Sequence, residues 1–161
     1  MLALRYAAVL ALAFWTGGLL VIGAFAAPSV FDVLGARGVE GRMLAGAVVG
    51  ELLRRFDLFA YGCAAVVLLS LAVRGVLGPR PRRFAFRVAG LFLMIVAAVY
   101  VGAVLTPRID RIQHSIGTAP SALAANDPQR IEFGRLHAMS ASMQLIPLLG
   151  GIALLFWELK D

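Results

Sequence analysis

Four long runs of apolar residues divide this chain, and each is bounded by charged residues or by proline. They extend over about residues 4–27, 58–73, 88–105 and 138–157. A helix rises 1.5 Å per residue, so roughly 20 apolar residues cross the hydrocarbon core of a bilayer, which is about 30 Å thick. The pattern therefore predicts an all-α polytopic membrane protein, a four-helix transmembrane bundle that forms a single domain over residues 1–161.

The second, third and fourth helices are expected to extend beyond the bilayer on its outer side. Segment 39–56 lacks proline and has a helical spacing of charges, so it is interfacial, re-entrant or continuous with the second span. Asp127 followed by Pro128 is typical of a helix start, about ten residues before the fourth run. We expect the third helix to continue past Pro107 and the first to stop at Pro28. No internal repeat is visible.

Charge predicts the orientation of the bundle. The segment 74–87 contains five arginines and no acidic residue, which is typical of a cytoplasmic loop. Four spans then place both termini in the cytoplasm. The arginine-rich composition favours a bacterial source, and hence the cytoplasmic (inner) membrane. The formal net charge is +6, but arginines that flank apolar runs usually reflect topology and contact with anionic lipid. The expected partner is therefore the lipid bilayer, and nucleic acid is not.

A polar layer is expected near the outer edge of the hydrocarbon. Asp57, Arg108 and His137 each lie 17–21 residues from the charged residue at the other end of their run, roughly 26–32 Å along a helix. Ionisable groups at this depth are costly unless they are paired, so we expect Asp57 to lie near an arginine and His137 to face the bundle interior. The candidate binding residues are Asp57, Arg54, Arg108, Arg135, His137, Ser140 and Gln144. The alternative is that these side chains only join neighbouring helices.

Motifs of soluble active sites are absent from the sequence. It contains no GxSxG, HExxH, Walker or dinucleotide-binding pattern, so no catalytic residue is assigned. His137 and Met139 point roughly 200° apart on one helix, and there is no metal-ligand spacing and no CxxCH. No metal site or cofactor is predicted, and haem or copper is the alternative. Cys63 is the only cysteine and can form no internal disulfide.

Five short segments carry a family resemblance. They are Trp15-Thr16-Gly17-Gly18, Ala27-Pro28-Ser29-Val30-Phe31, Leu53-Arg54-Arg55-Phe56-Asp57, Thr106-Pro107-Arg108-Ile109 and the stretch from Phe133 to Ser140. In this order the chain resembles the transmembrane-protein-205-like family, small four-helix membrane proteins without a settled function. The resemblance implies the same architecture and places the family's polar positions at Asp57, Arg108 and His137. A distant similarity to copper-resistance membrane proteins of the CopD type is a further implication, against which the ligand geometry argues.

Three functional hypotheses follow. The leading one is a membrane protein that binds or helps to move a small solute or ion at the outward-facing polar layer. The second is a structural or accessory subunit, either self-associating as a homo-oligomer or part of a larger membrane complex. The third is a haem- or metal-binding redox protein.

Overall fold

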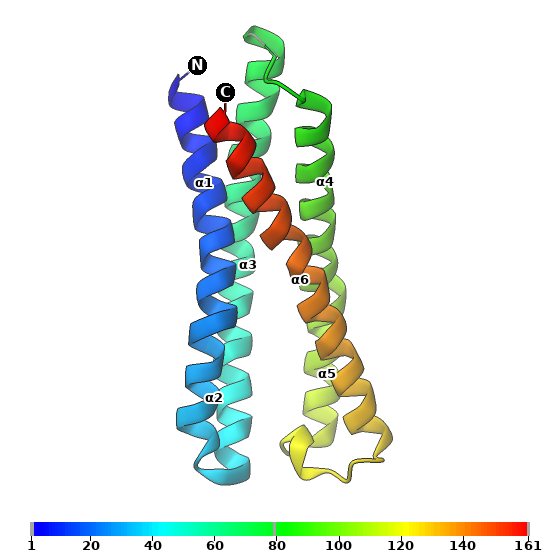
Figure 1. Ribbon diagram of the computed structural model, residues 1–161. Coiled ribbons are helices and arrows are strands. Elements are labelled where there is room, and N and C mark those ends of the chain that lie inside the picture. The colour runs from blue at the N-terminus through cyan, green and yellow to red at the C-terminus, as the bar shows by residue number, and fades with distance from the viewer. Residues whose placement is uncertain (1, 79, 161) are drawn as a thin grey trace.

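The computed structural model describes residues 2–78 and 80–160, and every regular element in these ranges is a helix (Figure 1). The chain first forms one long column made of α1 (Leu2–Val21), the π-helical segment η1 (Ile22–Ala26) and α2 (Ala27–Gly35). It returns as the single helix α3 (Gly38–Leu77). We call this antiparallel pair, residues 2–77, the first hairpin.

The second hairpin, residues 84–160, repeats this plan. Its first column consists of α4 (Phe84–Tyr100), the π-helical segment η2 (Val101–Leu105) and α5 (Thr106–Ile116). A longer connection, which includes the 3₁₀ turn η3 (Pro120–Ala122), leads into the returning helix α6 (Pro128–Lys160). Both termini lie at one end of the bundle (Figure 1), which we call the termini end; the connections 36–37 and 117–127 form the far end.

The lengths of the four columns confirm the all-α polytopic bundle. They contain 34, 40, 33 and 33 residues and are apolar enough to cross a membrane. At 1.5 Å per residue they measure about 50–60 Å, well beyond the roughly 30 Å of hydrocarbon. Segment 39–56 is continuous with the second spanning helix, which decides between the three alternatives. The expected start at Pro128 is also confirmed, and the side chain of Asp127 accepts a 2.8 Å hydrogen bond from the backbone N–H of Gln129.

Pro28 does not end the first helix, contrary to expectation. Proline has no N–H and its ring clashes with the carbonyl four residues before it, so a regular α-helix cannot pass through unchanged. The chain instead widens by one residue just before the proline, and the N–H of Ala27 donates to the carbonyl of Ile22. The same device precedes Pro107, where the N–H of Thr106 donates to the carbonyl of Val101. A π turn therefore lets the first column of each hairpin continue past its proline.

This shared device makes the two hairpins structural counterparts, although no repeat is visible in the sequence. In both, a π turn ends two residues before a proline, a shorter helix follows, and a long helix returns. The first columns of the two hairpins both run from the termini end toward the far end (Figure 1). The bundle thus consists of two similar hairpins placed side by side.

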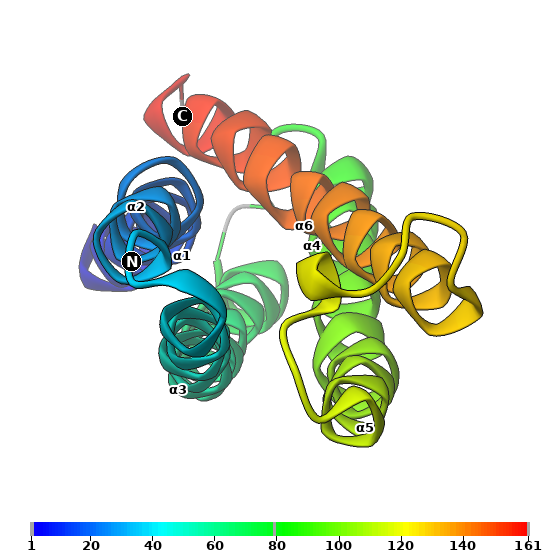
Figure 2. The same cartoon turned by 90° about the horizontal axis from the view of Figure 1, so that it is seen from below.

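The core that joins the hairpins lies between their spanning parts. α1 packs against α3 and α6, and α4 packs against α6 and α3, as the view along the bundle shows (Figure 2). Leu12, Trp15, Leu91 and Met94 are buried there almost completely. Small residues allow the close crossing of α6, because a Cβ built on Gly151 would lie 2.0 Å from the Thr16 methyl group. Toward the far end the hairpins diverge (Figure 1).

Candidate functional site

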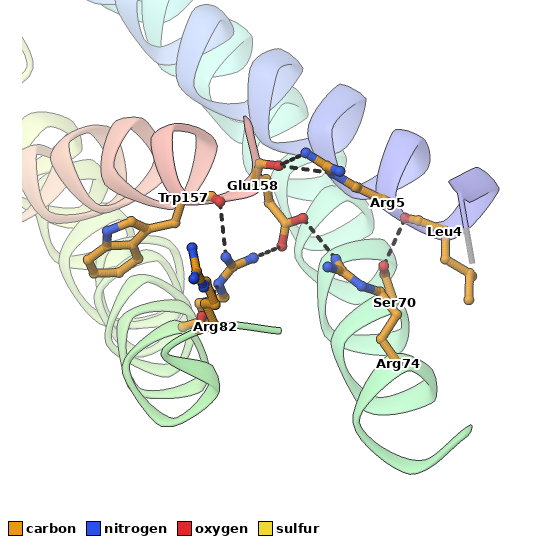
Figure 3. A network of polar contacts seen from close by, with 8 residues as sticks. Leu4, Arg5, Ser70, Arg74, Arg82, Trp157 and Glu158 are labelled. Carbon is orange, nitrogen blue, oxygen red and sulfur yellow. Dashed lines mark hydrogen bonds and ion pairs between the residues drawn. The ribbon is translucent and has the colours of Figure 1, made fainter. Parts of the chain in front are cut away.

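The most deeply buried charges lie at the termini end. The carboxylate of Glu158 accepts hydrogen bonds from Arg74 Nη1 at 2.8 Å and Arg87 Nη1 at 2.6 Å (Figure 3). The three side chains are only 2–9% exposed. Arg74 belongs to α3, Arg87 to α4 and Glu158 to α6, so one carboxylate connects the two hairpins.

Further hydrogen bonds extend this arrangement to the first helix. Arg5 Nε donates to the carbonyl of Glu158 at 2.9 Å, and Ser70 donates to the carbonyl of Leu4 at 2.8 Å (Figure 3). Arg87 also donates to the carbonyls of Arg82 and Trp157, both at 3.0 Å. We call Arg5, Ser70, Arg74, Arg87 and Glu158 the termini cluster. It draws a side chain from every spanning column, which is the arrangement of a structural clamp.

Sequence reasoning missed the termini cluster. There, Arg74, Arg87 and Glu158 marked the ends of apolar runs, and Arg74 and Arg87 also counted among the arginines that predict the cytoplasmic side. A usable signal was present, because Glu158 lies at the same membrane level as two arginines on other helices and has the opposite charge. A lone acid at that level needs a basic partner.

At the far end, the predicted arginines do not form a layer with the other candidates. Arg54 and Arg55 both bind Glu51 of their own helix, at 2.8 Å and 2.7 Å, and all three side chains are well exposed. Arg108 and Arg135 are also exposed. Arg108 lines a shallow depression between α5 and α6 together with Arg111, Ile112 and Glu132.

His137 does not take the interior position that we expected. It is exposed, and its ring stacks on Phe133 of the same helix with the ring centroids 5.9 Å apart and the planes 8° from parallel. Phe133 and His137 are four positions apart, about one turn of helix, so a local contact decides the orientation of the imidazole. Ser140 and Gln144 are half-buried on α6. The stripe of His137, Ser140 and Gln144 therefore begins on the surface.

Asp57 is the predicted residue whose polar group does point between helices. A Cβ built on Gly102 would lie 3.3 Å from Asp57 Oδ2 and 2.4 Å from the hydroxyl oxygen of Tyr61. The Tyr61 hydroxyl in turn lies 3.4 Å from the carbonyl of Ala98, to which it donates. We call Asp57, Tyr61 and Gly102 the α3–η2 seam. Its side chains come from the first hairpin and its backbone comes from the π turn of the second.

The expected ion pair between Asp57 and an arginine is not seen in the described ranges, 2–78 and 80–160. Their ion pairs within 4 Å involve Glu51 and Glu158, and none involves Asp57. The reason is the helical spacing. Arg54 and Arg55 lie three and four residues after Glu51 and share its face of α3, whereas Asp57 faces the second hairpin.

Two more contacts continue along the same face toward the far end. A Cβ built on Gly46 would lie 3.0 Å from the Nε2 atom of Gln113, and Arg42 donates to the hydroxyl of Ser121 at 3.0 Å. A Cβ built on Gly50, one turn later, would meet no atom within 4 Å, so of these two glycines Gly46 alone lies against another helix. The hairpins thus touch through single side chains here, unlike the packed core near the termini.

No three side chains of His, Cys, Asp and Glu lie close enough to share a metal ion within residues 2–78 and 80–160. The prediction that the protein holds no cofactor stays a prediction.

A family model described as "Domain of unknown function (DUF4149)" matches residues 10–117. The match covers more than half of the chain, and the chain therefore belongs to this family. The matched region includes the first hairpin almost entirely, together with α4, η2 and α5, and so contains the complete α3–η2 seam. No curated protein and no solved structure matches the chain. The narrower resemblance to the transmembrane-protein-205-like family stays a prediction.

Proposed function

We propose that this member of the DUF4149 family binds, or helps to move, a small solute or ion within the membrane, at the α3–η2 seam around Asp57. The observation that supports this most directly is the placement of Asp57. Its carboxyl group lies between the two hairpins, beside the backbone of Gly102, and pairs with no arginine in the described ranges. Ionisable groups at membrane depth are expensive, and those that persist usually mark ion or substrate paths.

The helix irregularity beside Asp57 supports the same proposal. Gly102 lies inside η2, and π turns occur frequently at functional sites because they change which backbone groups are free to bind. Irregular backbone at membrane depth is tolerated where protein or a polar site covers it. The contrast with Glu158 is informative, since two guanidinium groups at 2.6–2.8 Å neutralise that carboxylate. Glu158 fits a structural role, and Asp57 fits a binding role.

The other predicted residues fit a route of approach. Arg54, Arg108 and Arg135 are exposed on the half of the bundle toward the far end, which we call the far half. Ser140 and Gln144 are half-buried on α6. We propose that the far half faces outward from a bacterial cytoplasmic membrane, with the termini cluster at the cytoplasmic side. The arginine-rich connection between the hairpins supports this orientation.

A binding screen with purified protein in lipid nanodiscs tests the proposal. The thermal unfolding midpoint is measured across panels of inorganic ions and small polar solutes for the wild type, Asp57→Asn and Asp32→Asn. Asp32 is an exposed carboxylate on α2, so its variant is the matched control. A ligand at 100 times its Kd stabilises the folded state by about 2.7 kcal/mol. We expect a ligand to stabilise the wild type and the control Asp32→Asn, and Asp57→Asn to abolish this stabilisation. Equal stabilisation of all three proteins would refute the site.

A structural or accessory subunit is the second candidate. The observation in its favour is the apolar surface of the far half, where Phe31, Val33, Leu44 and Val48 are 42–67% exposed. Exposed apolar groups outside the hydrocarbon often mark a contact with another protein. Mass measurement in mild detergent distinguishes the two, because a subunit or homo-oligomer should run as a defined assembly and an independent binding protein as a monomer.

A further inference from the structure

We infer that the ligand of the α3–η2 seam is a proton, held on the carboxyl group of Asp57. This inference rests on the proposed function and names the ligand of that same site. Asp57 is half-buried between the hairpins, and a polar group at membrane depth must find its hydrogen-bond donors and acceptors in its immediate surroundings.

Acceptors are in excess around Asp57. An ionised carboxylate only accepts hydrogen bonds, and Tyr61, which lies beside the same Gly102, already directs its hydroxyl toward the carbonyl of Ala98. The third member of the seam, Gly102, has no side chain and contributes only backbone. Nothing in the seam therefore offers the carboxylate a strong donor.

The backbone of η2 adds further acceptors. The N–H of Thr106 donates to the carbonyl of Val101, five residues earlier. Pro107 comes next and has no N–H, so it provides no donor for the carbonyl of Gly102 or of Ala103 in either helical register. Gly102 is the residue beside Asp57. The π turn and the proline together leave a main-chain carbonyl oxygen of η2 without its normal N–H partner, close to the carboxyl group of Asp57.

A proton resolves this imbalance, and the seam has too few oxygen ligands among its side chains for a divalent cation. Uptake of one proton converts the acceptor-only carboxylate into a neutral acid with an O–H donor, which a main-chain carbonyl can accept. A divalent cation such as Ca²⁺ requires six to eight oxygen ligands. The side chains of the seam supply one carboxyl group and one hydroxyl group, and no metal-binding group of three is present in the described ranges.

The charged groups near Asp57 do not change this balance. On α3 itself, Arg54 and Arg55 bind Glu51, and Tyr61 is the titratable neighbour one turn away. α4 and η2 contribute no charged residue between residues 88 and 105. From α5, Arg108 and Arg111 line the depression that they share with Glu132 of α6. On the α1 side, Phe56 packs against Gly18.

Protonation should therefore tighten the contact between the hairpins. In the neutral form Asp57 donates to the second hairpin, and in the ionised form its charge faces carbonyl and hydroxyl oxygens. Proton release, COOH to COO⁻ plus H⁺, weakens the seam at a place where single side chains are the main contacts between the hairpins. The proton would reach Asp57 from the far end, where the polar residues are exposed.

Infrared pH titration of the full chain in lipid nanodiscs tests this inference. We expect a carboxylic-acid C=O band that decreases as the pH rises, is absent in Asp57→Asn and persists in Asp32→Asn. In parallel, the unfolding equilibrium is measured against pH. A group that binds one more proton in the folded state changes the equilibrium constant by up to about tenfold per pH unit. Wild-type stability should fall with rising pH relative to that of Asp57→Asn, whose amide remains neutral and retains a donor.

The results separate this inference from the proposed function. The same acid band and the same pH dependence in Asp57→Asn would overturn the proton assignment. If the ion and solute screen then still shows stabilisation that requires Asp57, the seam binds another ligand and the proposed function stands. Tyr61→Phe provides a second variant, because it retains the aromatic ring and removes the only other titratable group of the seam. The acid band should persist in Tyr61→Phe, because a phenol has no C=O group. A pH dependence of stability that Tyr61→Phe abolishes and Asp57→Asn retains would overturn the assignment to Asp57.

Discussion

Replacement of Glu158 by glutamine perturbs the termini cluster with little change in volume. The carboxylate now accepts from Arg74 and Arg87 at 2.8 Å and 2.6 Å, and it is 4% exposed. The amide oxygen of glutamine can accept from one guanidinium, but its NH₂ group then faces the other, donor against donor. Two buried cations also lose the anion that they share. Removal of one partner from a buried ion pair typically costs about 3–5 kcal/mol, which is the loss of unfolding free energy that we expect for Glu158→Gln.

The matched control is Glu51→Gln. Glu51 also binds two arginines at hydrogen-bond distance, but its side chain and those of Arg54 and Arg55 are 43–75% exposed. Water solvates these charges before and after the change, so the unfolding free energy should remain nearly constant. The two variants therefore remove the same chemical group from equally short contacts; Glu158 is buried and joins different helices, whereas Glu51 is exposed and binds arginines of its own helix.

Equilibrium unfolding in lipid bicelles provides the measurement, followed by a double-mutant cycle with Arg74→Gln. Because Arg74 and Glu158 contact each other, the double variant should lose less stability than the sum of the two single losses. If Glu158→Gln destabilises no more than Glu51→Gln, or if the cycle is additive, the termini cluster is not the clamp that joins the hairpins.

Two further predictions concern packing and orientation. Gly151→Ala would place a methyl group 2.0 Å from the Cγ2 atom of Thr16, so it should lower the unfolding free energy by about 1–3 kcal/mol. The added change Thr16→Ser removes Cγ2 and should recover most of this loss. Failure of the rescue in an unfolding assay would show that this contact does not limit the helix crossing. In a Cys63→Ala background, a membrane-impermeant thiol reagent on intact cells should label a cysteine placed at Ser121 but not one placed at Arg82, and the opposite pattern would reverse the proposed orientation.

Local sequence determined the elements of this protein because each depends on its own residues. The length of an apolar run decides whether a helix can cross the bilayer, so the four spanning helices and the all-α class could be predicted without knowledge of their neighbours. The start of α6 was equally local, since Asp127 and Pro128 act on the first turn that follows them. The same reasoning failed at Pro28, because a π turn can absorb a proline and no residue type marks that turn in advance.

The candidate site was predictable only in part. Asp57 was identified because a charge near the hydrocarbon edge is costly wherever it points, and the structure directs it between the hairpins. Its expected arginine partner and the interior placement of His137 were not found, because both depend on side-chain direction. One turn of helix brought Phe133 beside His137, and Glu51 beside Arg54 and Arg55, before any other helix could offer a partner.

Tertiary structure alone decided which charges of different helices meet. Glu158 is separated by 84 and 71 residues from Arg74 and Arg87, and only the packing of α6 against both hairpins brings the three together. The sequence by itself determined that charges end each apolar run, because the cost of placing charge in hydrocarbon is the same for every helix. Whether such a charge remains in solvent or becomes the centre of a clamp depends on the register between helices, which the close approach of Gly151 to Thr16 helps to set.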